Sequence, residues 1–412
     1  MTGTVIFINA SEVAACSGPP SARDGADPAS RIPHGAVATQ GGVIAEVGPE
    51  RELALRYPDS ARVDCGGGVL TPGLVDSHTH AVFGRWRPDE YELRCRGVPY
   101  LEIAARGGGI LASVRDLRLR SEDELVELAL ARLGTMLAHG TTSAEVKSGY
   151  GLSTEHELKT LRAIRRLNRL QPVHLVATFL GAHDFPAEYR EQRDRYVDLL
   201  VGESIPAVAE QKLARFCDVF MEPGVFDRAQ SERVLRAGLD HGLIPKLHAD
   251  ELEGSGGAEL AVELGAASAD HLGAVSRRGV AALAGSTTVA TLLPATLFFL
   301  GRTRYAPARA LLDAGATVAL ASDFNPGSSP TPGVPFAMSA ACSQMKMTPA
   351  EALRAATAGG ASALREDSKV GVIRPGAAAD LVLWRVESVN EIPYHLAAPR
   401  VAGVWIGGRK VV

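Results

Sequence analysis

The 412-residue sequence predicts an α/β protein: a (β/α)8 TIM barrel with a small β-sandwich domain formed by both chain ends. Three observations lead to this prediction. The middle of the chain alternates short apolar strand segments with amphipathic helices, a pattern typical of a parallel sheet with helical crossovers. Eight such strands can be counted, which is the number that closes a barrel. Both chain ends instead carry short segments broken by glycine.

The two chain ends are predicted to pair with each other. Their segments are short and rich in β-branched residues, as expected of small antiparallel sheets. These segments are residues 3–10, 35–48, 61–73, 371–386 and 401–412. We therefore assign residues 1–70 and 365–412 to the two parts of one β-sandwich, and residues 71–364 to the barrel.

The barrel strands are short apolar segments that end in polar residues. They are LVDSHTH (74–80), TTSAEVKS (141–148), VHLVATFLGAH (173–183), CDVFMEP (217–223), LIPKLHADE (243–251), SADHL (268–272), TVATLLP (288–294) and TVALASDFN (317–325).

Helix signals lie between these strands. Ser121 and Glu124 form a capping box before an amphipathic segment that Gly140 ends. Thr348 and Glu351 open another helix in the same way.

Composition excludes several classes of protein. Hydrophobic residues make up 46% of the chain and charged residues 22%, which is typical of a globular protein and not of a disordered or fibrous one. The 43 basic and 47 acidic residues give a net charge of -4, so no electrostatic field favours nucleic acid or an anionic membrane. We therefore expect a small-molecule substrate.

The cysteines and the N-terminal segment indicate a cytoplasmic protein. Five scattered cysteines without a CxxC pair argue against a disulfide framework and against a thiolate zinc site. The first residues lack the basic flank and apolar stretch of a signal peptide. The most apolar later segment, residues 289–301, is too short to span a bilayer.

Histidines and carboxylates gather where the predicted strands end. The carboxyl ends of barrel strands carry the catalytic side chains in this fold. The residues in question are His78 and His80 after strand one, His183 after strand three, His248, Asp250 and Glu251 after strand five, Asp270 and His271 after strand six, and Asp323 and Asn325 after strand eight.

Four of these residues form a candidate metal site. At a spacing of two on an extended strand, His78 and His80 face the same side, although such a pair alone is weak evidence. His248 adds a third nitrogen and Asp323 adds an oxygen, a set suited to Zn²⁺ or Fe²⁺ with room for water. Lys147 invites comparison with the carboxylated lysine of two-metal hydrolases, but we expect one ion because no second bridging carboxylate is apparent.

A metal site of this kind indicates hydrolysis of a C–N bond, because a bound cation activates water and polarises a carbonyl carbon. Asp323 is predicted to accept a proton from the attacking water. Glu251, three residues after a ligand, is predicted to face the substrate nitrogen, although a surface carboxylate is the alternative. His271 is placed to orient the water or to stabilise charge on the attacked oxygen.

The loops indicate an anionic substrate. Arg85, Trp86 and Arg87 follow strand one, and a guanidinium binds a carboxylate through two parallel hydrogen bonds. Tyr100 and Tyr150 add hydroxyl groups.

The motifs resemble one enzyme family almost from end to end. They are TPGLVDSHTHAVF, the GGGI segment at 107–110, EVKSGYGLS, FLGAHDFP, HADE, GGAELAVELGAASADHL, ASDFNPGSSPT and GVIRPGAAADLVLW. Together they resemble the imidazolonepropionase family. HTH and PGAAADLVL mark the wider amidohydrolase superfamily, whereas KSGYGL, GAHDFP and SDFNPGSSPT separate this family from its deaminase relatives.

The resemblance implies hydrolysis of 4-imidazolone-5-propanoate to N-formimidoyl-L-glutamate in histidine degradation, with one Zn²⁺ or Fe ion. It implies metal binding by His78, His80, His248 and Asp323. It also implies substrate or product contacts by Arg87, Tyr100, Tyr150, His183, Glu251, Asn325, Gly327 and Ser328. The chain departs from the family at Arg85-Trp86, where small residues are usual. The residue that binds the substrate carboxylate is therefore expected to be Arg87 or, alternatively, Arg85.

Two other functions are compatible with parts of the sequence. A cytosine- or guanine-deaminase-like enzyme would use the same His-x-x-Glu pattern but would release ammonia. A non-catalytic scaffold would be expected to have lost metal ligands, and all four are present.

The ligand set suits Zn²⁺ and Fe²⁺ alike. A homodimer is the ordinary state for a symmetric enzyme of this kind.

Overall fold

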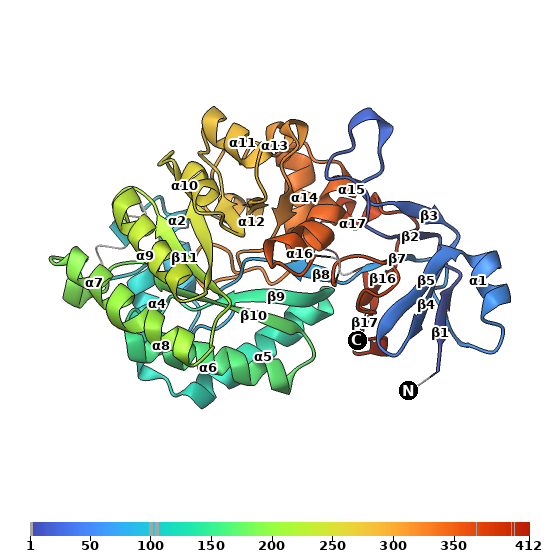
Figure 1. Ribbon diagram of the computed structural model, residues 1–412, viewed down its shortest axis with the longest axis horizontal. Helices are drawn as coiled ribbons and strands as arrows, with labels where there is room; N and C mark the ends of the chain where they lie inside the picture. The colour runs from blue at the N-terminus through green and yellow to red at the C-terminus, as the bar shows by residue number, and fades with distance from the viewer. Residues whose placement is uncertain (1–2, 99–101, 104–106, 368, 397, 399) are drawn as a thin grey trace.

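The centre of the molecule is a parallel eight-stranded barrel, seen in the computed structural model in Figure 1. The structure describes residues 3–98, 102–103, 107–367, 369–396, 398 and 400–412. All neighbouring strands pair in parallel and in chain order. They are β8 (Leu74–Asp76), β9 (Thr141–Lys147), β10 (His174–Ala182), β11 (Phe216–Met221), β12 (Ile244–Ala249), β13 (Ser268–His271), β14 (Val289–Leu292) and β15 (Val318–Leu320). The barrel predicted from the sequence is confirmed.

The first and last strands meet through the residues that follow them. Thr79 and Phe324 form an isolated parallel bridge. The His80 amide donates to the Phe324 carbonyl at 2.8 Å, and the Asp323 amide donates to the His78 carbonyl at 3.0 Å. These bonds close the barrel at the level of the polar strand ends.

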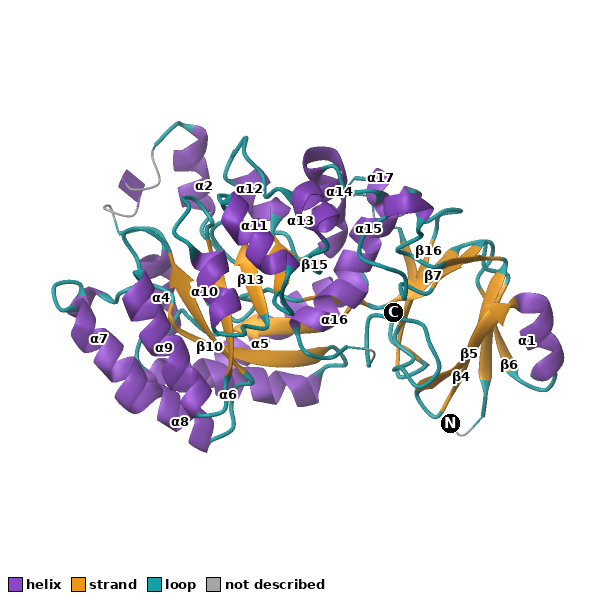
Figure 2. Cartoon of the chain, turned by 45° about the horizontal axis from the view of Figure 1, so that its top comes forward, coloured by secondary structure: helices purple, strands orange, loops and turns teal. Residues whose placement is uncertain are grey.

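Helices cover the outside of the barrel, as Figure 2 shows. The capping boxes at Ser121 and Thr348 are both formed. The helices after β8 are α2 (Pro88–Cys95), α4 (Ile110–Leu119) and α5 (Glu122–Ala138). Those that follow are α6 (Thr154–Leu170), α7 (Arg193–Leu199), α8 (Ile205–Glu210), α9 (Arg228–Asp240), α10 (Gly257–Glu263), α11 (Arg277–Ala284), α12 (Pro294–Phe299), α13 (Ala308–Ala314), α14 (Val334–Met345), α15 (Pro349–Arg354) and α16 (Gly360–Ala363).

Both chain ends build two further sheets beside the barrel. One contains β1 (Val5–Ile8), β4 (Gly35–Gln40), β5 (Val43–Pro49) and β6 (Ala61–Asp64), and α1 (Glu50–Arg56) joins its last two strands. The other contains β2 (Glu12–Ala14), β3 (Arg31–Pro33), β7 (Val69–Pro72), β16 (Leu381–Trp384), β17 (Val401–Ile406) and β18 (Arg409–Lys410), with α17 (Glu391–Tyr394) between β16 and β17.

The pairing of the two chain ends follows the prediction, with one difference. β16 pairs with β7, so the C-terminal strands complete a sheet that the N-terminal strands begin. The expectation of antiparallel sheets throughout is wrong, because β1 with β6 and β2 with β7 pair in parallel. Long connections join each of these pairs, and only such crossovers allow parallel neighbours. Among the described residues no helix is long and apolar enough to cross a membrane.

Candidate active site

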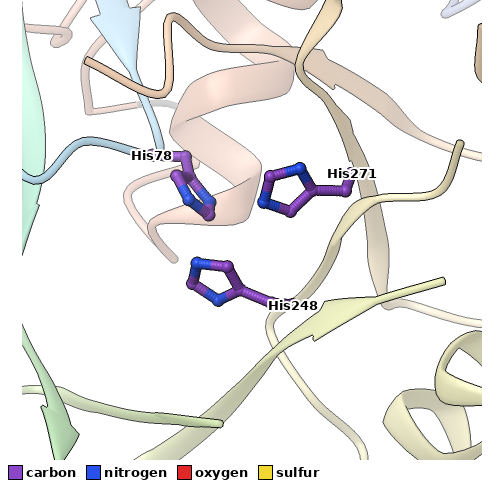
Figure 3. A group of neighbouring side chains, drawn as sticks. All are labelled: His78, His248 and His271. Carbon is purple, nitrogen blue, oxygen red and sulfur yellow. The ribbon is translucent and has the colours of Figure 1, made fainter. Parts of the chain in front are cut away.

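Six side chains from five strands meet at the carboxyl end of the barrel. His78 and His80 follow β8, His183 follows β10, His248 and His271 lie at the ends of β12 and β13, and Asp323 follows β15. All six are buried. Figure 3 shows three of the imidazoles, those of His78, His248 and His271, pointing toward one another.

The proposed metal ligands lie in overlapping groups. His78, His80 and Asp323 form one group whose candidate ligand atoms lie within 4.8 Å of one another. His248 belongs to two others, with His78 and His271 and with His80 and His183. The structure therefore brings all four predicted ligands to one place, and His183 and His271 each lie beside two of them.

The imidazole nitrogens in this cluster are suited to a cation. Within the described residues, the buried Nε2 of His78, Nδ1 of His80 and both ring nitrogens of His248 have no hydrogen-bond partner. Burial lowers the pKa of each of these imidazoles well below the ordinary value, so they remain neutral with lone pairs available. Buried polar atoms without partners are costly, and a divalent metal would satisfy one ring nitrogen of each imidazole. The residues therefore fit a metal ion.

Asp323 is held in a defined orientation beside these histidines. Its Oδ2 accepts a hydrogen bond of 2.6 Å from Thr296 at the start of α12. Its Oδ1 lies 3.6 Å from the Nε2 atoms of both His78 and His80. Burial raises the pKa of Asp323 to about 7. One carboxylate oxygen is thus anchored while the other faces the imidazoles.

The backbone is unusual at three of these strand ends. Asp250, His271 and Asp323 have φ angles of 50°, 76° and 52°, in the left-handed region that non-glycine residues rarely adopt. Such strain clusters at functional sites, where surrounding hydrogen bonds hold it. At Asp250 the carboxylate accepts bonds from the backbone amides of residues 255–258.

Glu251 lies in a loop that another carboxylate organises. Glu222 accepts hydrogen bonds from the backbone amides of Glu251, Leu252 and Glu253. The Glu251 Oε2 atom lies 3.6 Å from Nε2 of His271. Burial, followed by the nearby charge of Asp323, raises the pKa of Glu251 to about 8. At neutral pH this carboxyl group therefore holds a proton.

Arg87 and Arg85 occupy different surroundings. The Arg87 side chain is only 8% exposed, and its buried Nε and Nη1 atoms lack hydrogen-bond partners among the described residues, with Glu90 3.7 Å from Nε. It lies against Gly327, where a Cβ atom would come within 1.2 Å of Nη2. Arg85 is exposed, and its backbone amide donates to Asp116. Arg87 is therefore the better placed of the two to hold a buried anion.

His183 and Tyr150 form an aromatic wall beside the cluster. The ring of His183 stacks on His80 with centroids 5.0 Å apart and 14° between planes. Its Nδ1 lies 3.0 Å from the Gly149 carbonyl oxygen, so that Nδ1 donates and Nε2 stays free to accept. The Tyr150 ring lies 5.4 Å from that of His183.

The loop after Asp323 is organised by Asn325. Its Oδ1 accepts from the backbone amides of Gly327 and Ser328, and its Nδ2 donates to the Asp323 carbonyl and to Ser328 Oγ. The amide is thus engaged in shaping the loop, and its predicted contact with substrate or product stays a prediction. Tyr100, a further predicted contact, lies outside the described residues.

Sequence reasoning missed a buried charged network below the histidines. Lys147 and Lys246 lie among Glu145, Asp218 and Asp270, and all five side chains are fully buried. Burial would lower the pKa of Lys147, but Asp218, Glu145 and Asp270 outweigh it and hold that pKa above the ordinary value. Charged residues inside otherwise apolar strand segments were the signal that could have found this network.

A parallel barrel with convergent imidazoles and a carboxylate at its strand ends is the architecture of metal-dependent hydrolases. The amidohydrolase family model matches residues 69–411, and the model of the bacterial imidazolonepropionase-like composite domain matches residues 35–59. The chain therefore belongs to the amidohydrolases and, within them, to the imidazolonepropionase family, whose members are hydrolases that act on C–N bonds.

Two relatives illustrate the extent of the match. The imidazolonepropionase of Symbiobacterium thermophilum is 47% identical over 412 residues, which cover 99% of this chain and 97% of the relative. That of Geobacillus kaustophilus is 47% identical over 385 residues, which cover 92% and 91%.

Solved structures share the fold at lower identity. A zinc-bound adenosine deaminase from Xanthomonas campestris superimposes with a TM-score of 0.73 at 20% identity and covers 98% of this chain and 92% of that one. A zinc complex of an atrazine chlorohydrolase from Arthrobacter aurescens gives 0.70 at 18% identity, with 99% and 95% covered.

Proposed function

We propose that this chain hydrolyses 4-imidazolone-5-propanoate by ring opening to N-formimidoyl-L-glutamate, the reaction of imidazolonepropionase in histidine degradation. The observation that carries the proposal is a cluster of neutral imidazoles beside a buried arginine. Within the described residues, ring nitrogens of these imidazoles and Nε and Nη1 of the arginine lack hydrogen-bond partners. The imidazoles suit a metal, and the arginine suits the propionate of an anionic substrate. Family membership supports the same activity.

One Zn²⁺ or Fe ion would be held by His78, His80, His248 and Asp323. When bound, such an ion lowers the pKa of water and polarises a carbonyl group. The known structures of similar fold that hold zinc favour Zn²⁺, and the same ligand types also suit Fe²⁺.

The substrate is held at its anionic end by Arg87. A guanidinium presents N–H donors to a carboxylate, and within the described residues the buried Nε and Nη1 of Arg87 both lack a hydrogen-bond partner. His183 Nε2 and the Tyr150 hydroxyl are proposed to contact the ring. Asn325, Gly327 and Ser328 shape the loop that supports Arg87, and Tyr100 is proposed as a further contact.

The bond-breaking step needs one proton removed and one delivered. Water adds to the ring carbonyl carbon, the C–N bond breaks and the departing nitrogen gains a proton. Asp323 accepts the proton of the attacking water, with Thr296 fixing the orientation of its carboxylate. Glu251, protonated at neutral pH, donates to the nitrogen, and His271 orients the water or stabilises charge on the attacked oxygen.

The proposal is tested with purified protein, elemental analysis and freshly prepared 4-imidazolone-5-propanoate. We expect loss of substrate, stoichiometric formation of N-formimidoyl-L-glutamate and no ammonia. Release of ammonia from cytosine or guanine, without turnover of the imidazolone, would instead identify a deaminase. Absence of any bound metal would refute the proposed ligand set.

Further proposals concern organisation and location. We assign residues 1–70 and 365–412 to one β-sandwich domain and residues 71–364 to the barrel. We propose a homodimer, to be tested by light scattering. We also propose a cytoplasmic location, because the five cysteines are free thiols, as is usual in a reducing compartment; fractionation of cells tests this.

A further inference from the structure

In the buried charged network, Lys147 contacts three carboxylates at once, those of Glu145, Asp218 and Asp270. Lys147 lies on β9, Asp218 on β11 and Asp270 on β13, so that alternate strands contribute one layer of side chains inside the barrel. Lys147 Nζ lies 2.7 Å from Oδ2 of Asp218 and 3.4 Å from Oδ2 of Asp270. All three side chains are fully excluded from solvent.

The same two carboxylate oxygens contact two of the proposed metal ligands. Oδ2 of Asp270 lies 2.6 Å from Nδ1 of His78. Oδ2 of Asp218 lies 3.0 Å from Nδ1 of His248, within ion-pair distance although not aligned as a full hydrogen bond. Lys147 is therefore linked to His78 through Oδ2 of Asp270 and to His248 through Oδ2 of Asp218. These two imidazoles come from different strands.

This geometry determines which imidazole nitrogen faces the site. A carboxylate that accepts from Nδ1–H leaves the lone pair on Nε2, and such outer contacts orient the ring and fix its tautomer. Nε2 of His78 has no hydrogen-bond partner within the described residues. A carboxylate oxygen that receives a second donor from an ammonium group is fixed from two directions.

We propose that Lys147 is a positioning residue that orients His78 and His248 together, through Asp270 and Asp218, for metal binding. This inference rests on the proposed function, because it takes both histidines as ligands. Lys147 itself contacts neither the proposed ion nor the substrate. One ammonium group thus sets the relative position of two ligands that are 170 residues apart in the chain.

Lys246 provides a matched control inside the same network. It is also a fully buried lysine, and its Nζ lies 2.9 Å from Glu145, as Lys147 Nζ does. Lys246 Nζ donates a hydrogen bond to the Ser77 carbonyl, and Asp270 lies 3.9 Å away, beyond hydrogen-bond distance. Substitution of either lysine by methionine removes one buried charge, but only Lys147→Met removes the hydrogen bonds to Asp218 and Asp270.

The test measures Zn²⁺ affinity by chelator competition, and thermal unfolding of the metal-free proteins, for wild type, Lys147→Met and Lys246→Met. We expect Lys147→Met to weaken Zn²⁺ binding about 10- to 100-fold, the usual cost of losing contacts that orient a ligand. Lys246→Met should weaken it less than about threefold while lowering the unfolding temperature to a similar degree. Unchanged Zn²⁺ affinity in Lys147→Met, or equal losses in both variants, would overturn the inference.

A second pair of variants tests the same inference if the single lysine variants fail to fold. Lys147→Met/Glu145→Gln and Lys246→Met/Glu145→Gln each remove one buried cation and one buried anion, so the net buried charge is unchanged. The same difference in Zn²⁺ affinity is expected between them, and equal affinities would again overturn the role of Lys147. If wild type binds no Zn²⁺ or Fe²⁺, the proposed metal site fails. If wild type binds and Lys147→Met binds equally well, only the positioning role fails.

Discussion

Replacement of Gly327 by alanine should displace the Arg87 side chain and so prevent it from binding the substrate carboxylate. A Cβ at Gly327 would lie 1.2 Å from Nη2 and 2.4 Å from Cζ of Arg87. To regain ordinary van der Waals contact the guanidinium must retreat by about 2 Å. The backbone at Gly327 is outside the left-handed region, so alanine itself is tolerated there. The substitution therefore acts on the arginine and not on the chain.

The size of the effect follows from the hydrogen bonds that Arg87 is proposed to make. A hydrogen bond to a charged group contributes about 1.5–3 kcal/mol, so loss of one such bond lowers kcat/KM about 10- to 100-fold. Arg87→Met should reduce kcat/KM at least tenfold for the same reason, and Arg87→Lys should restore part of it because a point charge lacks the planar fork. Arg85→Met should change little, since that side chain is exposed.

A double-mutant cycle, measured as kcat/KM for 4-imidazolone-5-propanoate, tests whether Gly327→Ala acts through Arg87. If both substitutions act through one guanidinium, Gly327→Ala added to Arg87→Met costs little more than Arg87→Met alone. Gly134→Ala is the control, because a Cβ at that exposed position in α5 meets nothing within 4 Å. A normal KM in Gly327→Ala, or losses that multiply in the double variant, would refute this reasoning. A large rise in KM for Arg85→Met with a silent Arg87→Met would move the carboxylate site to Arg85.

Two further predictions concern the metal and the proton donor. His248→Ala should lower both the metal content and turnover, and full metal occupancy at an unchanged rate would remove His248 from the ligand set. Glu251→Gln should retain the metal but lower kcat by roughly 10²–10⁴, because the amide keeps the shape and cannot transfer a proton. Because the pKa of Glu251 is raised to about 8, its protonated form is lost as pH rises through that value, so kcat of wild type should fall above about pH 8. A near-normal kcat in Glu251→Gln, or an alkaline decline of kcat that this variant retains, would show that Glu251 is not the proton donor.

Much of the fold could be predicted because its signals are local. Each barrel strand is a short apolar segment, and the capping boxes at Ser121 and Thr348 mark helix starts within four residues. The candidate site also followed from local order, since a parallel barrel places every strand end at one rim. His78, His80, His248 and Asp323 could therefore be brought together without knowledge of any distance between them.

The contacts that support these residues could not be predicted in this way. Thr296 reaches Asp323 from the helix after another strand, and Lys147 reaches Asp270 across 123 residues of chain. No spacing in the sequence encodes such pairs, because they depend on which inward side chains share a layer of the barrel. The fit of Gly327 against Arg87 likewise depends on the approach of two separate loops.

The seam between β8 and β15 links folding to metal binding. His78 and His80 belong to one side of this seam and Asp323 to the other, and the Thr79–Phe324 bridge lies between them. An ion that joins these residues would act as a cross-link between the first and last strands of the barrel, and its binding energy would oppose opening of the cylinder. Hydrogen exchange at the amides of His80 and Asp323 should then slow when Zn²⁺ is added, whereas exchange that is indifferent to Zn²⁺ would contradict this.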